Sequence, residues 1–467
     1  MLDIALRNLI RNRRRSIVTA ASIAIGSVAV TLFSAFAANV TNGLQTETVI
    51  RLGHLNLFRK GYFASGGGNP GSFGIPDYET LIGKLRSDPV LKPMLTVVTP
   101  TVSVGGIVSG AVSDASSTFF AQGVVPADRR TMAQWNAYGL PGAADALTSG
   151  VPEGSTDRGI VGAGLARILN LCAPPAPRCG NAAAIAPATP PAEGTQAGRF
   201  ADLAKDIASA DVPGADGRPP EAIVDLLAAT SGGAPNVVSM RVVRQVRLGI
   251  KELDDRYVGM PIALAQKLLF GRGERQATAI VVQLRSTADL PRARERIAQL
   301  TRNSAVPLEI IDFMTLSPAY RQISEFYGTL SSFLMALICT VALFMTVNTM
   351  SASIFERTRE IGTLRALGMD RGPLRRLFVA EGLLLGTAGA TLGVGLAAAL
   401  VFALNHAGLT WMPPGSLRPV PMRFSFGGAL PTTAVLWVLL VFSAGLAARL
   451  AAGRAARLNV VTALRHA

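Results

Sequence analysis

SASIFERTREIGTLRALG, residues Ser351–Gly368, decides the fold of this chain. It follows the apolar run Gly328–Ile354, which has no charged residue, and precedes Leu377–Leu404, whose one charged residue is Glu381. Each run is long enough to cross a hydrocarbon core of roughly 30 Å as a helix. The charged stretch is therefore predicted to be an elbow, residues 355–376, that joins two membrane spans.

Two further runs, Ile17–Val40 and Gly427–Ala448, also lack charged residues. With 49% hydrophobic and only 16% charged residues, the chain of 467 residues belongs to the membrane class rather than to ordinary soluble proteins. We expect an α-helical membrane domain of four transmembrane helices plus a large extracytoplasmic α+β domain. The predicted spans are residues 17–40, 327–354, 377–404 and 429–448, with a short external loop at 405–428.

The formal net charge of +15 is concentrated in three segments: the N-terminal residues 1–16, the elbow and the C-terminal tail 449–467. By the positive-inside rule these three segments face the cytoplasm, and residues 41–326 lie outside. Arginines that flank spans are typical of topology signals or of contacts with lipid headgroups, so nucleic-acid binding is not expected. The arginines concerned are Arg7, Arg11, Arg13, Arg14, Arg15, Arg357, Arg359, Arg365, Arg371, Arg375, Arg376, Arg449, Arg454, Arg457 and Arg465.

Residues 1–16 carry apolar side chains at helical spacing with arginine and asparagine between them. This pattern predicts an amphipathic helix on the inner membrane surface. A secretory leader is the alternative, because Ala35, Phe36 and Ala37 form an A-x-A cleavage motif. The apolar core of such a leader is about 7 to 15 residues, and the run here is longer, which favours a retained first span.

The external segment, residues 41–326, is too long for a loop and is predicted to be a folded domain. Val-, Ile- and Thr-rich stretches predict strands, and Ala277–Leu284, Leu290–Arg302 and Val306–Phe313 read as a strand, helix, strand unit. The Ala-, Pro- and Gly-rich residues 140–220 are interpreted as an insertion or surface loop, with one short helix at Gly159–Leu171.

The chain has three cysteines. Cys172 and Cys179 lie in the external domain, where an oxidising compartment permits a disulfide, and free thiols remain the alternative. The histidines are not spaced as ligands with this pair, so no metal site is predicted. No GxxxxGK[ST], HExxH or GxSxG string is present, which gives no reason to expect an enzyme or a bound cofactor in this chain.

Small residues recur at four-residue spacing in the third span, at Gly382, Gly386, Gly389 and Gly393. Such spacing lets another helix approach closely, and we favour this helix packing over the alternative, loose use of glycine in a span. Glu381, near the inner end of this span, is expected to pair with a nearby arginine at the membrane interface; a functional carboxylate is the alternative.

The elbow has an apolar ridge with a charged rim, which suits either an interfacial helix or a helix that docks in a partner's groove. The string Ser353–Gly386, SIFERTREIGTLRALGMDRGPLRRLFVAEGLLLG, resembles the FtsX-like, MacB and LolC/LolE group of ABC transporter permeases, the type VII or mechanotransmitter group. ALRNLIRNRRRSIVT at residues 5–19 and AARLNVVTALR at residues 455–465 are similar to that group's two ends. GHLNLFRKGYF at 53–63 and YVGMPIALAQKLL at 257–269 resemble parts of lipoprotein-release permeases.

The resemblance implies a multi-pass subunit of the bacterial inner membrane with both termini cytoplasmic, paired with a second copy or a paralogue. A cytoplasmic ABC ATPase, which binds ATP and Mg, would be a separate subunit that moves the MacB-like periplasmic domain through the elbow. The leading cargo is a lipoprotein or other lipid-linked molecule; the alternatives are small-molecule or peptide efflux with an adaptor and an outer-membrane channel, or regulation of an envelope hydrolase. By position, the residues that would contact the ATPase are Glu356, Arg357, Thr358, Arg359, Glu360, Ile361 and Gly362.

Overall fold

The computed structural model describes most of the chain and divides it into two compact units. One unit is Thr46–Ser317, and the other contains the residues up to Gln45 and the helices from Pro318 onward. The described residues are 2–66, 69–110, 115–140, 150–171, 222–248, 251–271, 275–358, 363, 370–411 and 420–455.

Four long helices dominate the unit that contains the residues up to Gln45 and from Pro318 onward, as the apolar runs predicted; we call it the helical unit. They are α2 (Arg13–Leu52), α12 (Pro318–Glu356), α14 (Arg371–His406) and α15 (Phe426–Ala455). All four are long and apolar enough to cross a membrane, and each contains one predicted span. A short helix, α1 (Leu2–Arg11), precedes α2, and a two-stranded ribbon of β10 (Thr410–Trp411) and β11 (Val420–Pro421) lies between α14 and α15.

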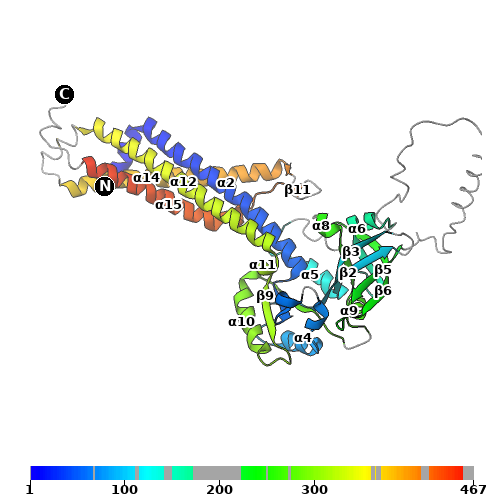
Figure 1. Ribbon diagram of the computed structural model, residues 1–467. Helices are drawn as coiled ribbons and strands as arrows, with labels where there is room; N and C mark the ends of the chain where they lie inside the picture. The colour runs from blue at the N-terminus through cyan, green and yellow to red at the C-terminus, as the bar shows by residue number, and fades with distance from the viewer. Residues whose placement is uncertain are drawn as a thin grey trace, which may run out of the picture. The chain divides into compact units, whose positions relative to one another are not determined.

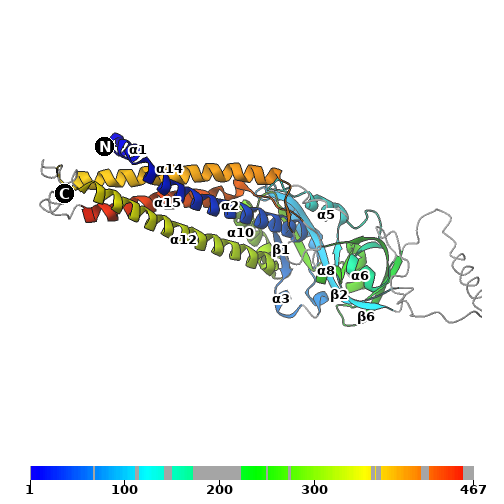
Figure 2. The same cartoon turned by 90° about the horizontal axis from the view of Figure 1, so that it is seen from above.

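The four long helices lie side by side in both views (Figure 1 and Figure 2). Their shared core contains Ile23 of α2, Ala342 of α12, Ala390 of α14 and Leu440 of α15, each at most 4% exposed. Small residues at two of these four positions allow close helix packing, which is how helices associate where lipid removes the hydrophobic driving force.

The Thr46–Ser317 unit, which we call the soluble unit, contains a sheet covered by two helices on one face. Its strands are β1 (Leu55–Arg59), β2 (Leu95–Gly110), β8 (Ala279–Leu284) and β9 (Leu308–Asp312), in the order β2-β8-β1-β9. Helices α4 (Tyr78–Ser87) and α10 (Leu290–Thr301) pack on it through a core that includes Ile82, Leu85 and Ile297. The predicted strand, helix, strand unit is confirmed as β8, α10 and β9, but β1 lies between its two strands. The arrangement is a split βαβ sandwich of the ferredoxin-like kind.

The remaining strands form a closed ring with the second half of β2. The ring runs β2-β3-β7-β4-β6-β5 and returns to β2, because β2 pairs with both β3 and β5. Helices α6 (Ala163–Ile168) and α9 (Ile262–Phe270) contribute Leu165 and Leu268 to its apolar core. The ring strands are β3 (Ser116–Val124), β4 (Arg158–Gly162), β5 (Ala222–Ala229), β6 (Pro235–Val246) and β7 (Tyr257–Pro261).

The prediction for Gly159–Leu171 was partly wrong. Its first residues form β4, which lies between β6 and β7, and only the residues after Gly162 are helical. Residues 158–168 of the predicted insertion thus contribute a strand and a core helix to the ring, whereas 141–149 and 172–220 are outside the described residues. Short elements complete the unit: α3 (Tyr62–Ser65), η1 (Pro70–Phe73), α5 (Pro126–Ala133), α8 (Lys251–Asp254), η2 (Thr287–Asp289) and α11 (Phe313–Leu316).

Candidate functional site: a polar cluster at the base of the elbow

Polar side chains from four helices meet where α12 ends and the elbow begins. We define the elbow cluster as Asn8 of α1, Arg15 of α2, Glu356 and Arg357 at the end of α12, and Glu381 of α14. All five lie in the helical unit. Each helix contributes a polar residue next to apolar neighbours, so folding of the bundle brings the polar groups together.

Glu381 is the centre of the cluster. Its residue is 2% exposed and Arg357 is 8% exposed. The Asn8 amide donates to Glu381 Oε1 at 2.7 Å, and the Arg357 guanidinium lies 3.3 Å from the same oxygen. Arg357 also donates to the backbone carbonyl of Asn8 at 3.3 Å. A buried carboxylate needs such partners, because an unpaired charge in a low-dielectric interior is strongly unfavourable. The expected pairing of Glu381 with an arginine is confirmed, and the partner is Arg357.

A second ion pair, Arg15 with Glu356, links the start of α2 to the end of α12. Both of its side chains are partly exposed, at 42% and 54%. Thr358 is buried, and its hydroxyl donates to the carbonyls of Ile354 and Phe355. The last turn of α12 is therefore held by contacts within this chain.

Only part of the predicted ATPase contact falls on described residues. Glu356 is exposed, whereas Arg357 and Thr358 are buried among their own helices. The contact with an ATPase stays a prediction for all of them. Arg359, Glu360, Ile361 and Gly362 lie outside the described residues, as do Cys172 and Cys179 of the predicted disulfide.

The four glycines of the third span lie against two different helices. A methyl group added at Gly382 or Gly386 would come within 2.4 Å or 2.7 Å of the Cβ of Ala448 or Ala444 in α15. At Gly389 it would come within 2.9 Å of the carbonyl oxygen of Ala20 in α2. Gly393 is equally close to α2, at 2.5 Å from Ser27 Cβ. The first pair faces α15 and the second pair faces α2.

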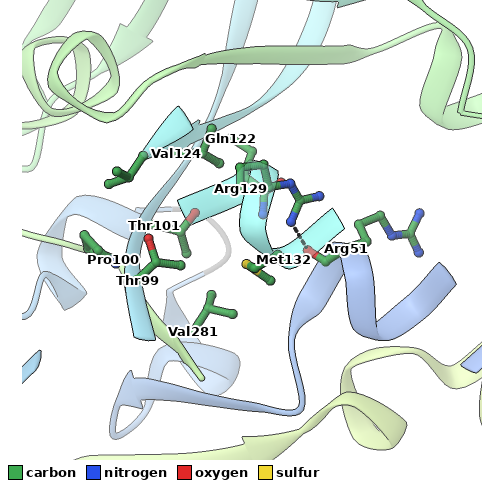
Figure 3. A pocket seen from close by; sticks show the side chains of 10 residues that line it. Arg51, Thr99, Pro100, Thr101, Gln122, Val124, Arg129, Met132 and Val281 are labelled. Atoms are coloured by element: carbon green, nitrogen blue, oxygen red, sulfur yellow. Dashed lines mark hydrogen bonds between the residues drawn. The ribbon is translucent and has the colours of Figure 1, made fainter. Parts of the chain in front are cut away.

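A second polar site, in the soluble unit, surrounds the end of α2 (Figure 3). Arg129 of α5 donates to the carbonyls of Ile50 and Arg51 at 3.0 and 2.7 Å. These carbonyls have no partner within a helix that ends here, so the guanidinium caps α2. Burial lowers the pKa of Arg129 and raises the pKa of Tyr257. The cavity that Arg51 and Arg129 line is about 10 Å³, about enough for one water molecule and too small for a substrate.

No group of three or more His, Cys, Asp or Glu side chains that could hold a metal ion occurs in the part of the chain that the structure describes. The elbow cluster contains two carboxylates and two guanidinium groups but no nucleophile with an adjacent base. Its arrangement can hold helices in register; it offers no groups for bond-making chemistry.

Four long apolar helices, a mixed α/β unit and a polar cluster between helices define a membrane protein with a soluble domain. Residues 332–456 match the FtsX-like permease C-terminal family. This match and the similarity to MacB proteins support the assignment of the chain as an FtsX/MacB-type ABC transporter permease, as the resemblance indicated.

The curated relatives are macrolide export ATP-binding/permease proteins MacB. The protein from Bdellovibrio bacteriovorus is 25% identical over 42% of this chain and 31% of its own length. The protein from Shewanella sp. is 28% identical over 46% of this chain and 33% of its own length. That from Neisseria gonorrhoeae is 30% identical over 29% of this chain and 21% of its own length. The matched part is thus a third or less of each of these relatives.

Proposed function

We propose that this chain is the permease part of an ABC transporter in which an ATPase outside these 467 residues drives movement of a periplasmic Thr46–Ser317 unit. The observation that carries the proposal is the elbow cluster: one buried carboxylate, Glu381, bonds to both α1 and the end of α12. A push on the elbow would act on three helices at once. α2 supports the same reading, because it is one continuous helix whose last turns belong to the soluble unit.

The proposed setting is the bacterial inner membrane with both termini cytoplasmic. Arginine placement supports this orientation. The chain would act with a second copy or a paralogue, and ATP and Mg would bind the ATPase.

We infer that the cargo is moved by the soluble unit rather than enclosed within one chain. The cavity beside Arg129 holds about 10 Å³, and a second cavity, lined by Arg15, Arg357 and Glu381 of the elbow cluster, holds about 20 Å³; neither has room for a drug-sized molecule. Lipid-linked cargo passed to a carrier is one candidate, supported by the likeness of residues 53–63 and 257–269 to lipoprotein-release permeases. Export of a small molecule through an adaptor and an outer-membrane channel is the second, favoured by the macrolide export for which the MacB relatives are named.

Purification of the full chain from its own membranes tests the ATPase coupling. A copurifying subunit with Mg-dependent ATP turnover is expected. Glu360→Lys should reduce its recovery about tenfold or more, since charge reversal in a docking helix leaves buried partner charges unpaired. Glu309→Lys, the same charge change at an exposed position of β9, is the control. Full recovery of an active ATPase with Glu360→Lys would count against the coupling role.

The molecules that copurify with the chain in the same preparation identify the class of cargo. Acylated protein trapped with the complex favours lipoprotein release, an adaptor with an outer channel favours efflux, and a copurifying hydrolase favours regulation.

A further inference from the structure

A small cavity lies beside the elbow cluster, between α1, α2, α12 and α14. Its polar lining is made of Asn8, Asn12, Arg15, Ser16, Thr349, Ser353, Arg357 and Glu381. The cavity is about 20 Å³, which is room for one oxygen atom or one water molecule. All of its lining residues belong to the helical unit.

Two guanidinium nitrogens in this lining lack a hydrogen-bond partner among the described residues. They are Arg15 Nη1 and Arg357 Nε, both shielded from solvent. The Arg357 side chain is 9% exposed, so its charge is held inside the bundle. Buried donors in native structures nearly always have an acceptor, because an unpaired one keeps the full cost of its desolvation. The two nitrogens are therefore available to an acceptor that is not among the described residues.

The charge around the cavity favours an anionic acceptor. Glu356 and Glu381 pair with Arg15 and Arg357 one to one. Further arginines at the ends of α1 and α2, including Arg11, Arg13 and Arg14, leave this end of the bundle positive. They stand where the first candidate span begins, which is the level of the lipid headgroups in the proposed membrane placement.

We propose that the cavity binds one phosphate oxygen of an acidic phospholipid, with the rest of the headgroup outside the cavity. Arg15 Nη1 and Arg357 Nε donate to that oxygen, and the lipid thereby fastens the base of the elbow to the bilayer. The inference rests on the proposed function only for its membrane placement. Inorganic phosphate offers the same oxygen chemistry, so the test must separate the two sources.

The test titrates purified full chain in neutral detergent with phosphatidylglycerol, phosphatidylcholine or inorganic phosphate, and native mass spectrometry counts the bound molecules. Binding of phosphatidylglycerol in preference to the other two is expected. Arg15→Gln removes one donor and should weaken that binding about tenfold or more, because bonds to charged groups are the strong ones. Arg15→Lys keeps the positive charge but lacks the planar set of N–H donors of a guanidinium, so it should weaken the binding of phosphatidylglycerol as well.

Arg14→Gln is the matched control, since it removes the same charge one residue away at an exposed position outside the cavity lining. It should change the affinity less than about threefold, because exposed charges are screened. Equal loss in both variants, no loss with Arg15→Gln or Arg15→Lys, or equally tight binding of inorganic phosphate would each overturn the proposal. A chain that fails to insert into membranes would instead overturn the proposed function.

Discussion

His54 is a fully buried histidine in the soluble unit that must stay neutral. The Leu284 amide donates to His54 Nδ1 at 3.0 Å, and His54 Nε2 lies 3.0 Å from the Thr287 hydroxyl. Nδ1 is therefore an acceptor, and the proton sits on Nε2. Burial lowers the pKa of His54 to about 4.

The free energy of unfolding is expected to fall on acidification because of His54. The unfolded histidine takes up a proton below its ordinary pKa of about 6.5, whereas the folded one does so only near about 4. The contribution is complete above pH ~6.5 and is lost as the pH falls through this window, by up to about 3 kcal/mol. Trp135, whose ring lies 5.1 Å from that of His54, reports the unfolding by fluorescence after Trp411 and Trp437 are replaced by Phe. An identical pH slope in His54→Gln would contradict this assignment.

Asp88 closes a turn between α4 and β2. Its carboxylate accepts from the amides of Val90 and Leu91 and from the guanidinium of Arg296 at 2.7 Å. The hydrogen bond from Arg296 holds the pKa of Asp88 below its usual range.

Asp88→Ala should lower the free energy of unfolding by about 2 kcal/mol, because it leaves two amides and a guanidinium without their acceptor. Arg296→Ala should cost less, since Asp88 keeps its amide partners. Denaturant unfolding of the full chain in detergent, followed by circular dichroism, measures both. A larger loss with Arg296→Ala than with Asp88→Ala would show that the ion pair, and not the turn, dominates.

At the scale of elements, the contact between α14 and α2 depends on glycine. Gly393→Ala would place a methyl group 2.6 Å from the carbonyl oxygen of Ala24, and backbone cannot move aside easily. We expect a loss of about 1 to 3 kcal/mol, as for other overpacked contacts. Gly395→Ala, two residues along the same helix, meets nothing within 4 Å and should be neutral. Thermal unfolding in one detergent compares them, and equal midpoints for the two variants would argue that this helix contact does not limit stability.

The helices were predictable because a long run without charge has few other structures available in a membrane. Of the elbow cluster, only the pairing of Glu381 with an arginine was predictable; the contact of Glu381 with Asn8 was not, because the two are 373 residues apart and no local pattern joins them. For Asn8 the only signal was its place among the polar residues of an amphipathic helix. β4 was mistaken for helix because a short buried apolar run fits either structure.

At the scale of the whole molecule, the orientation in the membrane is the most direct test. Single cysteines at Ser116, exposed in β3, and at Thr363, exposed in the elbow, would be introduced after the three natural cysteines are replaced by Ser. An impermeant thiol reagent should label Ser116→Cys in intact cells with a permeabilised outer membrane. Thr363→Cys should react only after the inner membrane is opened. The opposite pattern would reverse the proposed topology.

The insertion of the ring between β2 and β8 has a consequence during synthesis. β1 pairs only with β8 and β9, both made more than two hundred residues after it. At translation rates of 5–20 residues per second, β1 would emerge and wait roughly 10 to 40 s with both edges unpaired. Open strand edges of this kind invite aggregation. Nascent chains that end before Ala279 are expected to be cut by protease near Leu55–Arg59, because the strands that pair with β1 are still missing.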